Sequence, residues 1–144
     1  MRAPLIAALF ITSAAALAQP PDFALLDRNR DGSVTPVEAL ADPEIRKRFA
    51  QFDSDKDSQL SPAEYLAARE DIARRARLDA ALAARVKAAL AERGIALPSI
   101  SVESYEGQVR LSGFVPLPDM ASRAGRISAM VSGVRTVHNH IGVK

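Results

Sequence analysis

The hydrophobic pattern changes its period along the second half of the chain. Between Pro62 and Gly94 there is no other proline or glycine, and Ala, Leu, Arg and Glu dominate. This composition predicts one long helix, or two helices with a kink near residues 77–79. From Ile100 to Gly113 apolar and polar residues alternate instead, which is typical of strands. A helical stretch is therefore expected to lead into a sheet.

The predicted elements of this half follow in the order helix, strand, strand, helix, strand. Their expected bounds are 79–93, 100–104, 109–113, 118–131 and 134–143. Gly94 should end the first helix, Glu106-Gly107 marks the turn between the first two strands, and Ser132-Gly133 should end the second helix. None of these elements can bury its apolar side alone, so both helices should pack on one sheet face. The pattern predicts a small αββαβ domain and an α+β fold class.

Oxygen-bearing side chains alternate along two segments of the first half, residues 27–38 and 53–64, at an offset of 26 residues. A hard cation binds about six to eight oxygens, and a twelve-residue loop supplies them from positions 1, 3, 5, 7, 9 and 12. These positions hold Asp27, Asn29, Asp31, Ser33, Thr35 and Glu38 in the first segment, and Asp53, Asp55, Asp57, Gln59, Ser61 and Glu64 in the second. Position 6, where the chain must turn sharply, holds Gly32 and Ser58.

Capping boxes offer a simpler explanation for the end of each segment. Residues 35–38 and 61–64 each place a hydroxyl residue at the N-cap, proline at the first helical position and glutamate three residues after the cap. This explanation leaves out the acidic residues upstream, which would repel one another without a cation. The alternation of oxygens, duplicated at a fixed offset, therefore favours a cation-binding loop over a helix cap alone.

Short helices should lead into the two segments. Apolar residues lie just before each one, Phe23 and Leu26 before the first and Phe49 and Phe52 before the second. After the first segment the helix should stop near Ala41, and Asp42-Pro43 should cap and start the next helix. Val34 and Leu60, both at position 8, are expected to face each other in a short bridge.

These features resemble the EF-hand family of calcium-binding proteins over about residues 21–72. The resemblance implies paired helix-loop-helix calcium hands, with side-chain ligands from the Asp, Asn and Glu residues named above. Ser33 and Gln59 would provide main-chain carbonyls, and Thr35 and Ser61 would act directly or through water. Ser58 departs from the family pattern, and a side chain in the left-handed conformation costs about 1–2 kcal/mol. A dockerin-like module, which also pairs two such loops and binds a protein, is the alternative.

The first 18 residues have the features of a signal peptide. Arg2 supplies the positive start, Leu5–Leu17 is apolar, and Ala16-Leu17-Ala18 forms a small-x-small cleavage site. An uncleaved anchor is the alternative, although the apolar run is shorter than the roughly 20 residues that span a bilayer. We therefore expect a signal peptide at 1–18, domains at 19–77 and 78–144, and a periplasmic or secreted protein.

Composition adds two constraints. The chain has no cysteine, so disulfides cannot stabilise it after export, and bound calcium is expected to do so in the first half. Residues 19–77 carry 10 basic and 12 acidic residues (10 − 12 = −2), and residues 78–144 carry 8 basic and 5 acidic residues (8 − 5 = +3). The difference favours two modules with different partners.

Glycines and valines in the second half resemble the pattern of the BON family. The matching segments are Val86–Leu90, Ile100–Val102, Gly107–Val115 and Gly133–Ile141. BON domains occur mainly in exported bacterial envelope proteins and are associated with phospholipid binding, so the resemblance implies attachment to a membrane surface. The cations available for an anionic surface are Arg85, Lys87, Arg93, Arg110, Arg123, Arg126 and Arg135.

Arginines also cluster on the predicted long helix. They are Arg69, Arg74, Arg75 and Arg77. Contact with a polyanion would explain them, but Glu70–Arg74 and Asp71–Arg75 are spaced to pair along the helix, and this pairing is the favoured interpretation.

Motifs for catalysis are missing from the sequence. There is no nucleophile elbow, phosphate loop or zinc-binding helix motif, so no enzymatic activity and no nucleic-acid partner are expected. His138 and His140 point to the same side of a strand and could form half of a transition-metal site, but no third ligand is evident. The leading hypothesis is a non-enzymatic, calcium-binding envelope protein that attaches to phospholipid. The alternative is a calcium-stabilised module that binds an envelope protein or cell-wall polymer without lipid.

Overall fold

A computed structural model describes residues 22–95 and 99–144. The predicted signal peptide at 1–18 lies outside the described residues. The described residues divide into two compact units, one up to Tyr65 and one from Leu66, and the boundary lies within helix α3 (Pro62–Glu92). Of the two alternatives for this stretch, the single helix is confirmed, because α3 has no break near residues 77–79. No helix in the described part is both long and apolar enough to cross a bilayer.

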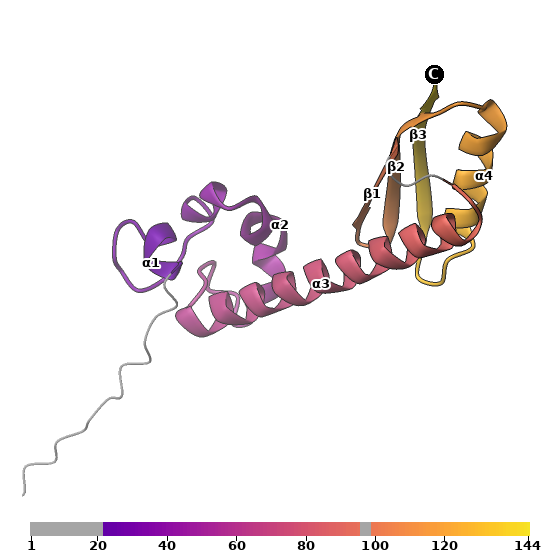
Figure 1. The fold of residues 1–144 in the computed structure, drawn as a ribbon. Helices are drawn as coiled ribbons and strands as arrows, with labels where there is room; N and C mark the ends of the chain where they lie inside the picture. Colours follow the sequence, from indigo (N-terminus) through magenta and orange to yellow (C-terminus); the bar gives the residue numbers. More distant parts are fainter. Residues whose placement is uncertain (1–21, 96–98) are drawn as a thin grey trace, which may run out of the picture. The chain divides into compact units, whose positions relative to one another are not determined.

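The first unit contains short helices on either side of two loops (Figure 1). They are α1 (Phe23–Leu26), η1 (Glu38–Ala41), α2 (Pro43–Phe52) and the first residues of α3. The predicted start of α2 is confirmed, because the Asp42 carboxylate accepts hydrogen bonds from the N–H groups of Glu44 (3.0 Å) and Ile45 (3.1 Å). This cap satisfies donors that the first turn of a helix leaves without partners.

The prediction that Pro36 begins the helix after the first loop was wrong. Pro36 and Val37 form a turn, and η1 is a single 3₁₀ turn that starts at Glu38. Asp42 already caps the next helix, so the intervening residues have room for only one tight turn. At the second loop the prediction is confirmed, because α3 begins at Pro62.

Aromatic and aliphatic side chains form the core of the first unit. Phe23, Val34, Leu60 and Tyr65 are fully buried. The rings of Phe23 and Tyr65 meet edge to face, with centroids 5.3 Å apart and planes at 80°. Such a contact adds about 0.5–1.5 kcal/mol to the burial of the rings. It ties α1, which precedes the first loop, to the start of α3, which follows the second loop.

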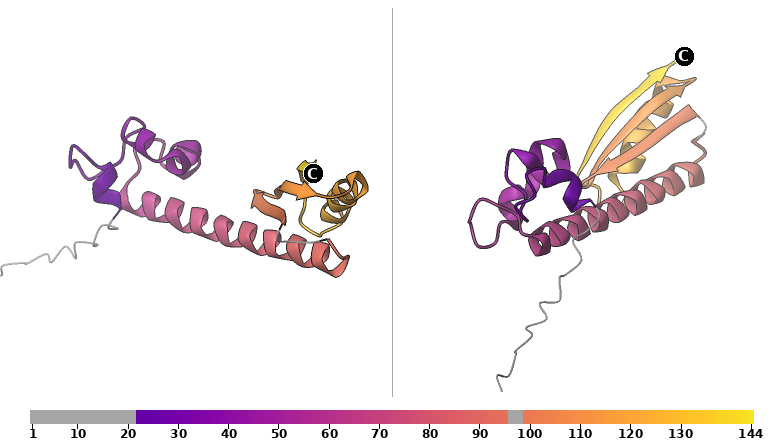
Figure 2. Two further views of the ribbon diagram at one scale, coloured as in Figure 1. Left: turned by 45° about the horizontal axis from the view of Figure 1, so that its top comes forward. Right: turned by 90° about the vertical axis from the view of Figure 1, so that its left-hand side faces the viewer.

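The second unit is a three-stranded sheet with the predicted αββαβ order. Its further elements are β1 (Ile100–Tyr105), β2 (Gln108–Val115), α4 (Pro118–Ala129) and β3 (Thr136–Val143). The strand order is β1-β2-β3, with β1 antiparallel and β3 parallel to β2. Parallel neighbours need a crossover connection, and α4 provides it. Figure 2 shows α4 running along one face of the sheet.

Both helices pack on the same face of this sheet, as predicted. The buried core combines residues of α3, of the strands and of α4: Leu82, Val86, Leu90, Ile100, Val102, Val109, Leu111, Val115, Ala124 and Ile127. Gly94 has a φ of +74° and ends α3 as predicted, with the N–H of Ile95 bonded to the carbonyl of Leu90 at 3.0 Å. Asn139 on β3 donates to the carbonyl of Ala121 at 2.8 Å and so fixes α4 to the sheet.

Candidate functional site

The two loops of the first unit are joined by backbone pairing. Val34 and Leu60 form an isolated antiparallel bridge, with both N–H···O distances at 2.9 Å. This confirms the predicted bridge. The Ser33 hydroxyl is also in hydrogen-bond contact with the side-chain amide of Gln59, one position before the bridge in each loop. The loops therefore form one pair, in which the same position of each loop faces its counterpart.

Both loops turn through the left-handed region at the same two positions. Gly32 and Ser58, at position 6, have φ values of +88° and +67°. The expected strain at Ser58 is therefore present. Arg30 and Lys56, at position 4, also have positive φ values, +60° and +61°. The sequence interpretation missed this second left-handed residue, because neither arginine nor lysine indicates such a conformation.

The aspartates at position 1 accept hydrogen bonds from backbone N–H groups on the far side of their loops. The Asp27 carboxylate is buried and accepts from Asp31 (3.2 Å) and Gly32 (3.1 Å). One oxygen of Asp53 accepts from Ser58 at 3.1 Å. The other oxygen, Oδ1 of Asp53, is buried and has no hydrogen-bond partner among the described residues. A buried carboxylate oxygen without a donor is costly unless a cation or water satisfies it.

Three carboxylates converge in the second loop. Asp53, Asp55 and Asp57 each offer an oxygen, and these oxygens lie within 4.8 Å of one another. Two unit charges at this separation repel by about 1 kcal/mol even in water, and by more where water is excluded. A divalent cation would remove this repulsion and supply a partner for the buried oxygen of Asp53. The donor set consists of hard oxygens, which suit Ca²⁺ or Mg²⁺ better than a transition metal.

In the first loop, Asn29 and Asp31 bond to each other and to the loop backbone. The Asn29 amide donates to Asp31 at 2.8 Å, and its oxygen accepts the Asp31 N–H at 3.0 Å. The hydroxyl and N–H of Ser33 also donate to Asp31, at 2.8 and 2.9 Å. These bonds, led by the Ser33 hydroxyl, lower the pKa of Asp31. The lowered pKa favours the ionised carboxylate, which is the form that binds a cation.

A glutamate at position 12 joins the two ends of each loop. Glu38 accepts from the N–H of Arg28 at 3.0 Å and from the N–H and hydroxyl of Thr35 at 2.9 and 2.8 Å. Glu64 accepts in the same way from Ser54 at 2.8 Å and from Ser61 at 2.9 and 2.8 Å. The N–H groups of Thr35 and Ser61 are the largest causes of the lowered pKa of Glu38 and Glu64. The reciprocal hydrogen bonds of a capping box are present in both loops, although Thr35 lies before a turn and not directly before a helix. Among the described residues, the carboxylates close enough to share an ion are those of Asp53, Asp55 and Asp57, and neither glutamate belongs to this group.

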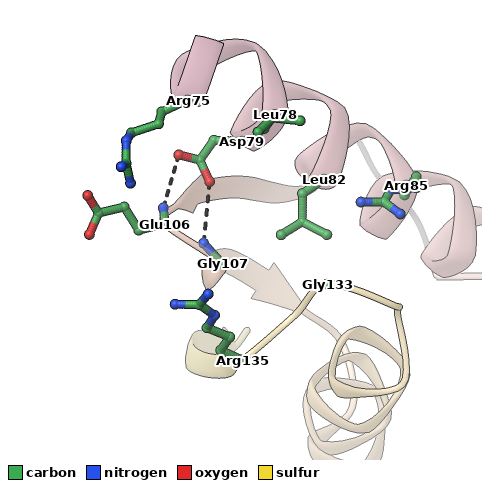
Figure 3. Close-up of a pocket in the computed structure, with 9 residues that line it drawn as sticks. All are labelled: Arg75, Leu78, Asp79, Leu82, Arg85, Glu106, Gly107, Gly133 and Arg135. Atoms are coloured by element: carbon green, nitrogen blue, oxygen red, sulfur yellow. Dashed lines mark hydrogen bonds between the residues drawn. The ribbon is translucent and has the colours of Figure 1, made fainter. Parts of the chain in front are cut away.

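In the second unit, Asp79 on α3 holds the turn between β1 and β2 (Figure 3). Its carboxylate accepts from the N–H of Glu106 at 2.9 Å, the N–H of Gly107 at 3.4 Å and the hydroxyl of Ser104 at 3.2 Å. Glu106 and Gly107 both have positive φ, +50° and +79°, as a two-residue type I′ turn requires. The sequence interpretation predicted the turn but gave Asp79 no role. The sequence signal for this role was an acidic residue on the core-facing side of the helix. Such a residue can accept hydrogen bonds from a turn whose N–H groups have no partner in the strands.

The structure separates most of the seven cations predicted to contact an anionic surface. Arg85 and Arg135 line a single cavity together with Arg75, which was not among the seven. Arg110 lies on the other sheet face, between Glu103 and His138 in the strand register. Arg126 is 3.9 Å from Asp119 on its own helix. Lys87, Arg93 and Arg123 are exposed and are not in the lining of this cavity.

The arginines of α3 pair as expected at one of the two predicted positions. Arg75 is bonded to Asp71 at 2.6 Å. The prediction for Glu70 and Arg74 was wrong, because Arg74 also pairs with Asp71, one residue nearer. Asp71 is buried and Glu70 is exposed, so the buried carboxylate attracts both guanidinium groups.

The two histidines lie on β3 beside residues of β2. His138 is paired with Arg110 and His140 with Ser112. Within residues 22–95 and 99–144, neither histidine belongs to a group of three His, Cys, Asp or Glu side chains close enough to hold an ion. The neighbouring guanidinium group of Arg110 would oppose a cation there.

Comparison with known families finds a match within the second unit. Residues 78–144 match the BON domain. The match covers the second part of α3, all three strands and α4, and it supports the predicted BON resemblance. The BON domain is generally associated with phospholipid or envelope binding. It does not include the paired loops of the first unit, and no curated protein matches the chain.

Proposed function

We propose that this chain is an exported, non-enzymatic protein of the bacterial envelope whose BON domain attaches to phospholipid surfaces. The observation that carries this proposal is the match of residues 78–144 to the BON domain. The positive net charge of this half supports it, since each cation near an anionic leaflet contributes about 1 kcal/mol. The signal-peptide pattern of residues 1–18 supports delivery to a compartment where such surfaces are accessible.

The paired loops, in this proposal, form an EF-hand pair that binds calcium. The observation that favours it is the buried Oδ1 of Asp53, which has no hydrogen-bond donor among the described residues, in a side chain that lies beside two further carboxylates. Asp27, Asn29, Asp31 and Glu38 would hold the ion in the first loop, and Asp53, Asp55, Asp57 and Glu64 in the second. Calcium would stabilise the first unit by mass action, because it binds the folded loops and not the unfolded chain.

Sedimentation with lipid vesicles tests the phospholipid part. The full chain is mixed with vesicles of phosphatidylcholine alone, or of phosphatidylcholine with one quarter phosphatidylglycerol, at about 0.1 M salt, where surface charges act over about 10 Å. We expect the protein to sediment with the anionic vesicles and to dissociate from them at high salt. Absence from both pellets at low salt would contradict phospholipid attachment.

A module that binds an envelope protein or a cell-wall polymer, with no affinity for lipid, is the second candidate. Large apolar side chains exposed on the second unit favour it, among them Tyr105 and Phe114 on the sheet. Capture from envelope extract by the full chain, compared with vesicle sedimentation of the same preparation, separates the two. A saturable protein or polymer partner without vesicle binding would replace the phospholipid proposal.

A further inference from the structure

The cavity of the second unit that Arg85 and Arg135 line has a volume of about 310 Å³. Side chains of α3 form one wall, at positions 75, 78, 79, 82 and 85 on one face of the helix (Figure 3). The other walls are the turn at Glu106 and Gly107 and the segment that leads into β3. Ligand cavities usually measure about 300–1,000 Å³, so this one can hold a small group but not a lipid chain.

Hydrogen bonds hold the walls of this cavity together before any ligand is present. Asp79 fixes the β1–β2 turn to α3 through the two N–H groups described above. The N–H of Arg135 donates to the carbonyl of Gly107 at 2.8 Å and fixes the third wall to the turn. A preformed site loses less entropy on binding than one that must be ordered.

Two glycines leave room for the arginine side chains. A β-carbon added at Gly107 would lie 3.2 Å from Cγ of Arg135 and 3.2 Å from the carbonyl oxygen of Gly133. One added at Gly133 would lie 3.4 Å from a terminal nitrogen of Arg85. Arg135 therefore lies against Gly107 and Arg85 against Gly133, and the two glycines are themselves neighbours. The guanidinium groups are brought to the same cavity from positions 50 residues apart.

Some charged side chains that line the cavity have partners of opposite charge or hydrogen-bond donors, and others do not. Asp79 accepts three hydrogen bonds from the wall, and Arg75 is bonded to Asp71 and lies near Glu106. Arg85 and Arg135 have no carboxylate partner among the described residues. Guanidinium groups bind phosphate or carboxylate oxygens in a two-pronged fashion, and two such groups in one cavity favour an anion.

We propose that this cavity binds a phosphate group between Arg85 and Arg135. The proposal rests on the proposed attachment to phospholipid, and it names the headgroup phosphate as the part of the lipid that the domain binds. Leu78, which is 64% exposed at the edge of the cavity, offers apolar surface beside the charges, as an amphiphilic ligand needs. A soluble glycerol phosphate has the same headgroup chemistry and is the second source of such a ligand.

Two charge-matched double variants of the full chain test the site. The cavity variant is Arg85→Gln with Arg135→Gln, and the control is Arg93→Gln with Arg123→Gln, which removes the same charge outside the cavity. In the vesicle arm, with one quarter phosphatidylglycerol, both variants should lose some affinity, because each cation near an anionic leaflet contributes about 1 kcal/mol. We expect the cavity variant to lose about tenfold or more beyond the loss of the control. In the soluble arm, glycerol 1-phosphate is titrated into the labelled chain and the amide signals of Gly107 and Gly133 are followed by NMR. We expect these signals to shift in the wild type and in the control but not in the cavity variant.

The two arms separate this proposal from the proposed function. If the wild type ignores vesicles but the Gly107 and Gly133 signals shift with glycerol phosphate, phospholipid attachment fails while the phosphate site stands, with a soluble ligand. If both variants lose vesicle affinity equally and the amide signals of Gly107 and Gly133 do not shift, attachment to phospholipid stands. The phosphate site in the cavity is then overturned. If the wild type responds in neither arm, both are overturned. The lysine variant, Arg85→Lys with Arg135→Lys, should retain part of the affinity, because it keeps the charge but not the planar donor pair.

Discussion

The carboxylate of Asp79 on α3 accepts a hydrogen bond of 2.9 Å from the backbone N–H of Glu106, in the turn between β1 and β2. The turn has positive φ at both central residues, and the N–H of Gly107 also donates to the Asp79 carboxylate, at 3.4 Å. One helical side chain therefore satisfies a strained turn and places it against the helix. This hydrogen bond joins two walls of the arginine-lined cavity.

Removal of the Asp79 carboxylate should destabilise the second unit. In Asp79→Ala the N–H groups of Glu106 and Gly107 lose their acceptor, and hydrogen bonds to charged groups contribute about 1.5–3 kcal/mol. We expect a loss of about 1–2 kcal/mol in the free energy of urea unfolding, since part of the site is open to water. Glu103→Ala, an exposed acid on β1, is the control and should change stability by less than about 0.5 kcal/mol. Equal losses in the free energy of unfolding of the two variants would contradict the role assigned to Asp79.

Glycine at position 58 should stabilise the second loop. Ser58 has a φ of +67°, which costs a residue with a side chain about 1–2 kcal/mol, while glycine loses about 0.5–1 kcal/mol more entropy on folding. Ser58→Gly is therefore expected to gain roughly 0.5–1 kcal/mol in thermal or chemical unfolding, and to tighten cation binding in that loop. Ser54→Gly, in the same loop but without a positive φ, should not stabilise it. If both variants change stability in the same direction and amount, the strain at Ser58 has no energetic consequence.

The acid sensitivity of the chain should depend on Asp71. Hydrogen bonds from Arg75, and then from Arg74, hold the pKa of Asp71 below its ordinary value of 3.8. A carboxyl with a lowered pKa stabilises the folded state above that ordinary value, and this contribution disappears as the pH falls through the lowered pKa. Asp71→Asn should therefore melt at a lower temperature than wild type at pH 7, and the gap should narrow below about pH 4.

Glu70→Gln is the matched control for this pH series, because Glu70 is the adjacent acid on α3 and is exposed. Its melting temperature should stay close to that of the wild type at every pH. The difference in melting temperature between Asp71→Asn and wild type could instead stay constant from neutral to acid pH. That result would show that ionisation of Asp71 contributes nothing to the stability of the fold.

The glutamates at position 12 should control the response to calcium. Glu38→Gln and Glu64→Gln each remove one carboxylate from a loop, and we expect each to weaken calcium binding about tenfold or more, since ligand charge sets the affinity of such loops. The readout is the rise in melting temperature that calcium causes, because both glutamates also cap helices and affect stability without the ion. Asp22→Asn, which lies before α1 and outside the loops, should keep the full rise. A double variant that still melts higher with calcium would place the ion elsewhere.

The order of elements could be predicted from the sequence because local signals agree. Alternation of apolar residues marked β1 and β2, and Gly94 and Gly133 marked helix ends, so the predicted bounds lie within a few residues of those observed. The bridge between Val34 and Leu60 followed from the repeat, since equal positions of paired loops must meet.

Features that depend on distant contacts could not be predicted. The cavity joins Arg85 to Arg135 across the parallel pairing of β2 and β3, and no local pattern gives that pairing. The need for glycine at position 113 also depends on a contact outside its own strand. It fits the alternation of β2, but a β-carbon there would lie 2.0 Å from the carbonyl oxygen of Ser99, a contact that only the folded chain reveals.

Calcium titration of the chelator-treated full chain, by calorimetry with and without anionic vesicles, tests the central claim most directly. The account predicts saturable uptake of calcium by the paired loops, with dissociation constants near or below about 10⁻⁴–10⁻³ M. It also predicts that uptake persists when the chain is bound to vesicles. Absence of any saturable uptake in that range, in both conditions, would contradict a calcium-binding protein that attaches to phospholipid.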